Sequence, residues 1–133
     1  MQATLTVVAY VVVVEARLLV VRKRQTAKFM FPGGKPLPGE PYRAAVAREV
    51  QEELGCRIAA VTNLGKFVTA AANEPNTQLV AYVYQGRLWG KPAPTNEIEE
   101  LRWITGNETG IELAPLLTDC ILPLLRQQGQ LHR

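Results

Sequence analysis

The sequence predicts an α/β fold, because segments typical of strands alternate with segments that have the three- and four-residue spacing of helices. Residues 3–14 are rich in valine, which favours the pleated conformation of a buried strand. Residues 41–55 and 111–128 instead space their apolar side chains three and four positions apart, as amphipathic helices do. The chain has 133 residues and contains no linker or internal repeat, so we expect one domain spanning residues 1–133.

A β-hairpin is expected near the N-terminus. Residues 3–14 form its first strand, residues 15–16 a tight turn and residues 18–21 its second strand. A short loop follows over residues 25–30. Glycine and proline then recur over residues 32–39, so we expect a further loop there without regular structure.

The helix predicted over residues 41–55 has clear start and stop positions. Pro41 suits the first helical position, where the N–H that it lacks is not needed. Gly55 suits the C-terminal stop. Apolar residues recur every four positions between them and form a stripe that can pack on a sheet: Val46, Val50 and Leu54.

The middle of the chain predicts two strands joined by a turn. Residues 57–72 contain a strand that is bent around residues 63–65, and residues 73–76 form the turn. Residues 77–85 form the second strand. Its alternate side chains lie on two faces, with Leu79, Ala81 and Val83 on one and Val80, Tyr82 and Tyr84 on the other.

The last third of the chain predicts a loop, a short strand and a helix. Residues 86–96 are rich in glycine and proline and are expected to be a loop. Residues 101–104 form a short strand. The helix over residues 111–128 contains Pro115 near its start and Pro123 further along, where a bend is expected.

Several classes of chemistry are excluded by composition. The chain contains no serine, and its only histidine, His132, lies next to the C-terminal residue, so a serine nucleophile and histidine-ligated zinc are both unfavoured. Asp119 is the only aspartate, so acid–base or metal chemistry must rest on glutamate. The net charge of +3 favours phosphorylated ligands. The sequence contains no dense block of lysine and arginine, so a nucleic-acid polymer is not expected as a partner.

Membrane and redox patterns are also informative. The longest apolar run, residues 7–14, is too short to span a bilayer, and the N-terminus does not have the pattern of a signal peptide. Cys56 and Cys120 form no close-spaced metal motif, and we interpret them as packing residues of a reduced, cytoplasmic protein, with a disulfide between them left open.

Three carboxylates gather on the helix predicted over residues 41–55. Glu49, Glu52 and Glu53 are related as i, i+3 and i+4 and therefore share one face, where they repel one another. An oxygen-binding cation such as Mg2+, or Mn2+, would relieve that repulsion and could bridge the carboxylates to phosphate. The glycine-rich loop before the helix adds backbone donors for the same phosphates. The alternative is a solvated acidic face balanced by nearby arginines: Arg43, Arg48 and Arg57.

The wider pattern decides between these interpretations. Residues 34–56 resemble the motif of the Nudix hydrolase family, G-x5-E-x7-R-E-U-x-E-E-x-G-U, in which U is a bulky aliphatic residue. The matching residues are Gly34, Glu40, Arg48, Glu49, Val50, Glu52, Glu53 and Gly55. Only Cys56 departs from the pattern, and because it is also apolar we interpret it as a packing variation.

The resemblance implies a fold and a reaction. The fold is an α/β/α sandwich with a mixed β-sheet, and the reaction is hydrolysis of a nucleoside diphosphate linked to another moiety, X. Glu49, Glu52 and Glu53 would bind one or more Mg2+ ions, with the carbonyl of Gly34 as a further ligand. One of these glutamates, or one further along the chain, would act as the general base. Glu40 and Arg48 resemble a pair that ties the loop to the helix.

A downstream carboxylate completes the site in many relatives. Three glutamates precede the Trp103 strand: Glu97, Glu99 and Glu100. We favour Glu97, because relatives commonly place a glutamate in the loop before this strand. A solvated loop glutamate is the alternative for each of the three.

Substrate-binding residues are less well indicated. Arg22 lies where some relatives place a basic residue against phosphate or sugar, and Lys35 follows the glycine pair. Both could equally be solvated surface cations. Phe31 and Tyr82 could frame a base, although a strand aromatic is more often part of the core.

Three functions are compatible with the pattern. The first is Mg2+-dependent cleavage of a nucleoside or deoxynucleoside triphosphate to monophosphate and pyrophosphate. The second is hydrolysis of ADP-ribose or a sugar nucleotide, and the third is a nucleotide-sensing module without activity, against which the intact glutamates argue. Relatives that remove oxidised dGTP read the purine with an asparagine where this chain has Leu116 or Leu117, so the base stays open. The expected partner is a small nucleotide, with a homodimer consistent with the sequence.

Overall fold

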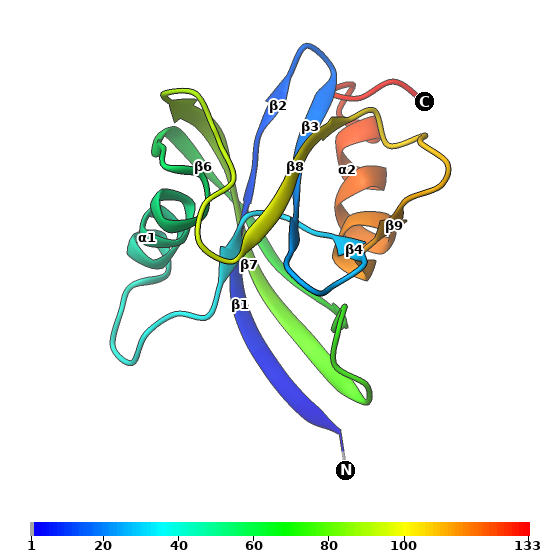
Figure 1. Cartoon of the computed structure of the whole chain (residues 1–133). Helices are drawn as coiled ribbons and strands as arrows, with labels where there is room; N and C mark the ends of the chain where they lie inside the picture. Colours follow the sequence, from blue (N-terminus) through cyan, green and yellow to red (C-terminus); the bar gives the residue numbers. More distant parts are fainter. Residues whose placement is uncertain (1) are drawn as a thin grey trace.

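Two helical layers enclose β-sheets in the computed structural model, which describes residues 2–133 (Figure 1). The strands of the described residues are β1 (Ala3–Val11), β2 (Val13–Val14), β3 (Arg17–Lys23), β4 (Lys28–Phe29), β5 (Gly33–Gly34), β6 (Arg57–Ala70), β7 (Thr77–Trp89), β8 (Ile98–Ile104) and β9 (Glu112–Leu113). The helices are α1 (Tyr42–Leu54), a π-helix, η1 (Leu116–Ile121), and α2 (Leu122–Gln127), which continues η1.

The largest sheet is mixed, with the strand order β5-β1-β7-β6. β1 runs parallel to β7 from the pair Ala3–Thr77 to the pair Val11–Gln85. β6 and β5 are antiparallel to their neighbours β7 and β1. A second, antiparallel sheet has the order β2-β3-β8, and β4 pairs in parallel with β9. The predicted α/β class with a mixed sheet is therefore confirmed.

Strand alternation builds two cores, one on each face of the sheets. Along β1, Val8 and Tyr10 pack towards α1, whereas Ala9 and Val11 pack towards η1 and α2. Successive side chains of a strand point to opposite faces, so each buried strand serves both cores. Figure 1 shows α1 on one side of the strands and α2 on the other.

Several elements confirm the sequence-based predictions. The β2–β3 hairpin pairs Val13 with Leu18, and its turn residues Glu15 and Ala16 have φ angles of 51° and 59°. These angles fit a two-residue turn whose twist matches the flanking strands. α1 begins at Tyr42, so Pro41 is its extended N-cap and not, as predicted, its first helical residue, and Gly55 caps the other end in the left-handed conformation with φ of 69°. β6 is irregular at two places, one of which lies between Asn63 and Gly65.

The prediction of one helix over residues 111–128 was wrong. Residues Glu112–Leu113 form β9, and the helix begins as the π-helix η1 before it becomes α2. Pro123 has no N–H to donate to the carbonyl four residues earlier, and its ring crowds that carbonyl. The N–H of Leu122 bonds to the carbonyl of Leu117, five residues back, so the wider π turn accommodates the proline.

Three predicted loop boundaries also change. β7 continues to Trp89, four residues beyond the expected end at residue 85, because β6 supplies a partner as far as Arg57. β4 lies in the loop expected over residues 25–30, and β5 consists of the glycine pair in the loop expected over residues 32–39. Strands of two residues are too short to show a period. No helix in residues 2–133 is long and apolar enough to cross a membrane, and Cys56 and Cys120 are both free thiols.

Candidate active site

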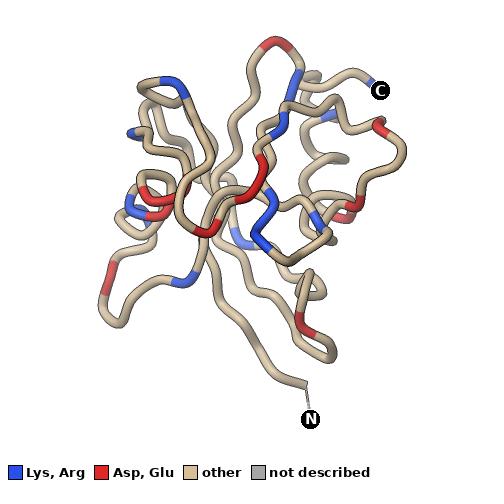
Figure 2. The backbone as a smooth tube through the Cα atoms, in the orientation of Figure 1, with Lys and Arg blue, Asp and Glu red and all other residues tan. Residues whose placement is uncertain are grey.

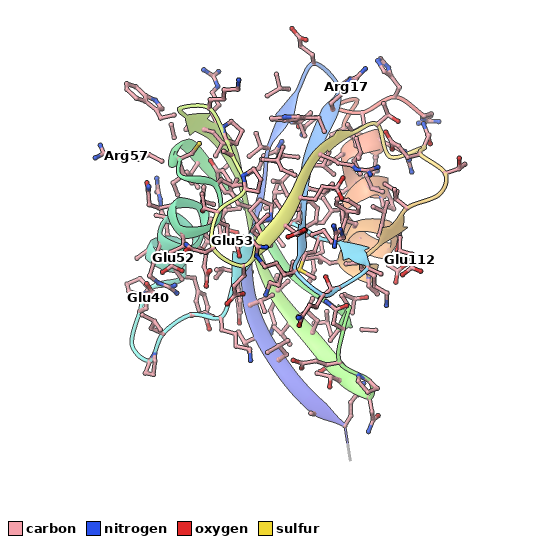
Figure 3. The ribbon with its side chains drawn as sticks, in the orientation of Figure 1. Arg17, Glu40, Glu52, Glu53, Arg57 and Glu112 are labelled. Carbon is pink, nitrogen blue, oxygen red and sulfur yellow. The ribbon has the colours of Figure 1, made fainter. Side chains whose placement is uncertain are left out.

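The helix α1 directs its carboxylates according to how it packs. Val46, Val50 and Leu54 are buried against the sheet, which turns the neighbouring face of the helix towards the glycine pair of β5. Figure 3 shows Glu52 and Glu53 on α1, with Glu40 in the loop that precedes the helix.

Glu53 is the most deeply placed of the three carboxylates. Its side chain is buried, and its Oε1 accepts a hydrogen bond of 3.0 Å from the backbone N–H of Gly33. The pKa of Glu53 is raised to about 8, chiefly by burial and also by the nearby carboxylate of Glu49, while the hydrogen bond from Gly33 acts in the opposite direction. A cation that binds Glu53 therefore competes with a proton near neutral pH.

Glu49 lies directly against Gly34. A Cβ atom built on Gly34 would collide with the carboxylate of Glu49, so only glycine leaves room for this side chain where it stands. Burial is also the main cause of the raised pKa of Glu49, against which Arg48 acts. The sequence motif pairs Gly34 with Glu49 by spacing, and the structure supplies the steric reason for glycine.

Arg48 connects the loop to the helix. Its Nε and Nη2 donate to the two carboxylate oxygens of Glu40 at 2.9 and 3.0 Å. Its Nη1 lies 3.3 Å from Glu49 and 3.4 Å from Glu52, and Nη2 also donates to the carbonyl of Lys35 at 3.2 Å. Glu40, whose pKa Arg48 holds below its usual range, closes the loop by accepting the N–H of Leu37. A bidentate arginine fixes direction as well as distance, so the glycine loop is held against α1.

The C-terminal end of α1 holds a second loop in place. The carbonyl of Glu53 accepts the backbone N–H of Thr95 at 3.0 Å, and the carbonyl of Glu52 accepts the hydroxyl of Thr95 and, at 2.7 Å, the amide of Asn96. These contacts satisfy helix carbonyls that have no partner within the helix. They also place Glu97, the next residue, near Glu53. Thr95 and Asn96 were not among the predicted site residues, although asparagine is common at left-handed positions such as the one Asn96 adopts, with φ of 52°.

Glu97 differs from the two glutamates that follow it. Glu97 lines the same cavity as Glu53 and lies 4.0 Å from the Nζ of Lys23. Glu99 pairs with Arg24 at 2.8 Å, and Glu100 with Arg102 at 2.6 Å, and neither lines the cavity. The structure therefore brings only Glu97 of these three to the carboxylates of α1.

The cavity has a volume of about 780 Å3 and two chemically different ends. The acidic end contains the glutamates together with backbone donors and two lysines: Glu49, Glu52, Glu53, Glu97, Gly33, Gly34, Lys23 and Lys35. The rest of the cavity is mostly apolar and is lined by Leu5, Val7, Phe31, Leu79 and Leu116 among others, with Asn73 and Glu74 as polar exceptions. A volume of this size lies within the range of small-molecule sites.

The four substrate-binding predictions divide into two pairs. Phe31 and Lys35 line the cavity, whereas Arg22 and Tyr82 do not. Arg22 donates to Glu100 and to the carbonyl of Thr26, and Tyr82 stacks on Tyr42 with ring centroids 4.2 Å apart.

The alternation of side chains along β7 and β3 explains why Tyr82 and Arg22 do not line the cavity. Tyr82 lies on the face of β7 that packs towards α1, not on the face that carries Leu79. Lys23, one residue after Arg22, lines the cavity in its place. A change of register in β3 falls between these two residues, which a sequence does not reveal.

The donor set suits a hard divalent cation. In residues 2–133, no three acidic, histidine or cysteine side chains already converge as a formed metal site, and Arg48 lies between Glu49 and Glu52. The carboxylates at the acidic end nevertheless offer only oxygen, which Mg2+ and Mn2+ prefer. The close fit of Glu49 over Gly34 also leaves that carboxylate facing the cavity. The residues present therefore fit a bound divalent cation.

Comparison with known proteins agrees with this arrangement. The family model of the NUDIX domain matches residues 4–125. The chain belongs to the Nudix family. An uncharacterized Nudix hydrolase of Pseudomonas aeruginosa is 34% identical over 113 residues, which make up 77% of this chain and 63% of the relative. This Nudix chain thus spans less than two thirds of the length of that relative.

Solved structures show the same fold. A MutT NUDIX hydrolase from Burkholderia pseudomallei is 25% identical, with a TM-score of 0.73 over 85% of this chain and 92% of that one. A UDP-X diphosphatase is 23% identical, with a TM-score of 0.79 over 100% of this chain and 66% of that one. A MutT protein from Methanosarcina mazei Go1 is 21% identical, with a TM-score of 0.74 and 96% coverage of both chains. The last two likenesses concern the fold alone.

Proposed function

We propose that this Nudix domain hydrolyses the pyrophosphate link of a nucleoside diphosphate joined to X, and that its preferred substrate is a nucleoside or deoxynucleoside triphosphate. One observation supports the proposal: four glutamates and the glycine pair line one part of a cavity whose other part is mostly apolar. An acidic end with a divalent cation suits phosphates, and an apolar end suits a base or sugar face.

The proposed roles follow from the position of each side chain. Glu49, Glu52 and Glu53, with Gly34, would hold Mg2+, which when bound neutralises phosphate charge and lowers the pKa of water. Glu97 is largely exposed at the cavity, with 76% of its side chain accessible, so we assign it the general-base role.

The remaining residues of the site bind the phosphates of the substrate or position the glycine loop. Lys23 and Lys35 contribute positive charge for phosphate oxygens at the acidic end. Glu40 and Arg48 keep the glycine loop against α1 through their bidentate contact.

An ADP-ribose or sugar-nucleotide substrate is the second candidate. The cavity volume of about 780 Å3 leaves room for a moiety on both sides of a pyrophosphate. A sensing module without activity is the third candidate. Binding without hydrolysis does not require all four carboxylates of the acidic end, so their presence argues against this candidate.

Removal of one carboxylate tests the proposed reaction. Glu52→Gln should lower turnover at least about a hundredfold, because the neutral amide is a poor ligand for a hard cation. Glu99→Gln is the matched control, since Glu99 pairs with Arg24 outside the cavity. Products from nucleoside triphosphates, ADP-ribose and sugar nucleotides would be separated by ion-exchange chromatography, with Mg2+, with Mn2+ and with EDTA. Equal rates for both variants, or turnover in EDTA, would contradict the metal assignment, and no product from any nucleotide would favour the sensing module.

A further inference from the structure

A second surface lies at the far end of the β6–β7 ribbon, away from the cavity. Trp89, the last residue of β7, is 73% exposed. Tyr84 and Leu88 pack towards α1, so the alternation of the strand turns Arg87 and Trp89 to the opposite face. An indole this exposed leaves one broad aromatic surface in contact with water.

Strand pairing adds a second arginine to this face. Arg57 lies directly opposite Trp89, and Ala59 lies opposite Arg87. Side chains at directly opposite positions share a face of the sheet and have Cβ atoms about 5 Å apart. Ile58, between Arg57 and Ala59, packs towards α1, which confirms the orientation of the ribbon. Trp89 is therefore flanked by one arginine across the ribbon and by another along its own strand.

The charge around Trp89 is positive and unbalanced. Residues 55–96 contain four lysines and arginines but a single acidic residue, Glu74, which precedes β7 at the opposite end of the ribbon. In the described part of the chain, no acidic side chain pairs with Arg57, Arg87 or Lys91, the exposed lysine that follows Trp89 by two residues. Figure 2 shows lysine and arginine, without aspartate or glutamate, at the upper left end of these strands, and Figure 3 shows Arg57 pointing outwards there.

We propose that this surface, defined by Arg57, Arg87 and Trp89, with Lys91 in the loop that follows, binds single-stranded nucleic acid, with an unpaired base stacked on Trp89 and the cations on the adjoining phosphates. Alternation of cations with an exposed aromatic ring on a sheet is the arrangement that such binding needs. A bilayer would require further apolar neighbours for insertion, and the nearest on this face is only Ala59.

No polymer partner was predicted, because the sequence contains no contiguous block of lysine and arginine. Arg57 and Arg87 are thirty positions apart in the chain and become neighbours of one tryptophan only through the β6–β7 pairing. This surface is independent of the proposed hydrolysis, because none of its residues lines the cavity.

Tryptophan fluorescence provides a direct test. The chain has two tryptophans, so Trp103→Phe leaves Trp89 as the sole reporter. Titration with an oligothymidylate of about ten nucleotides should quench this emission, and the apparent affinity should fall as salt is added. Arg57→Ala with Arg87→Ala should reduce the slope of log affinity against log salt by about 1.4, at about 0.7 for each lost phosphate contact.

A labelled oligothymidylate tests the stacking contact by fluorescence anisotropy. Trp89→Ala should weaken binding about fivefold to a hundredfold. Lys66→Ala is the matched control, because Lys66 is an exposed cation of β6 that pairs with Tyr82 on the α1 face. Nucleotide hydrolysis and the melting temperature of Trp89→Ala should equal those of the parent protein.

Four results would overturn the proposal. These are an absence of quenching, equal binding by the Trp89→Ala and Lys66→Ala variants, and displacement of the oligonucleotide by excess nucleoside triphosphate, which would place it in the cavity. The fourth is quenching by phosphatidylserine vesicles or polyglutamate that exceeds quenching by the oligonucleotide, which would identify a membrane or an acidic protein as the partner instead.

Discussion

The acidic and apolar ends of the cavity differ in how the chain builds them. The acidic end comes mainly from residues 33–53, where one helix and the loop before it supply three carboxylates and the glycine pair. The apolar end draws on β1, the segment after β4, the β6–β7 connection with the first part of β7, and the start of η1. The proposed chemistry thus rests on local geometry, whereas the choice of ligand rests on the packing of distant segments.

Gly34→Ala disrupts the acidic end alone, and we expect a larger effect from it than from any substitution at the apolar end. The new Cβ would meet the carboxylate of Glu49, which must move away from its present position. Turnover should fall by about a hundredfold, as expected when a metal ligand is displaced, with little change in KM. Steady-state kinetics at saturating Mg2+ would measure both constants.

A second substitution distinguishes displacement from misfolding. The double variant Gly34→Ala with Glu49→Asp shortens the side chain that collides, so it should recover part of the lost turnover. If the double variant is no faster than Gly34→Ala, steric displacement of Glu49 is not the cause of the loss.

Leu116→Ala tests the apolar end, with an expected effect of intermediate size. Leu116 is buried and lines the cavity at the start of η1. Removal of its side chain should raise KM about tenfold and leave kcat nearly unchanged, because contact with an apolar part of the ligand is lost in the ground state and the transition state alike. The substitution lowers the free energy of unfolding by about 2–5 kcal/mol, so the rates should be measured well below the melting temperature of the variant.

Val68→Ala serves as the control for the apolar end, because Val68 is exposed on β6 and does not line the cavity. Both kinetic constants of this variant should match those of the parent protein. A loss of kcat in Leu116→Ala as large as that in Gly34→Ala would remove the distinction between the two ends.

The smallest expected effect concerns stability and pH in metal-free protein. The pKa of Glu53 is about 8 in the folded state and near 4.5 when unfolded, so the folded state binds its proton more tightly. The unfolding free energy should therefore fall as pH rises from about 4.5 to about 8, and level off above that range. The side chain of the Glu53→Gln variant cannot ionise. The melting temperature of this variant minus that of the parent protein should therefore increase as pH rises across this interval. Thermal melts in EDTA would reveal the difference, and parallel curves would contradict the assigned burial effect.

The difference between local geometry and the packing of distant segments also explains which elements of the fold could be predicted from the sequence. The β2–β3 hairpin, the limits of α1 and the two faces of β7 follow from periods and turn residues that lie within short windows. The C-terminal helix was predicted to begin at residue 111, but Glu112 and Leu113 form β9 because they pair with the distant β4. The π turn at Leu122 likewise depends on how Pro123 is accommodated. Lys23 was missed for a similar reason, since a register change in β3 decides which basic residue faces the cavity.

By itself, the sequence determined the family motif and the residues that form the acidic end, because helix spacing places Glu49, Glu52 and Glu53 together without reference to the rest of the chain. Only the tertiary structure decided that Glu97 joins them, through contacts of Thr95 and Asn96 with the end of α1. The tertiary structure likewise assembled the apolar end of the cavity and the arginines around Trp89. The physical reason is that sheet register and loop anchoring join residues far apart in the chain, and no local period encodes those pairings.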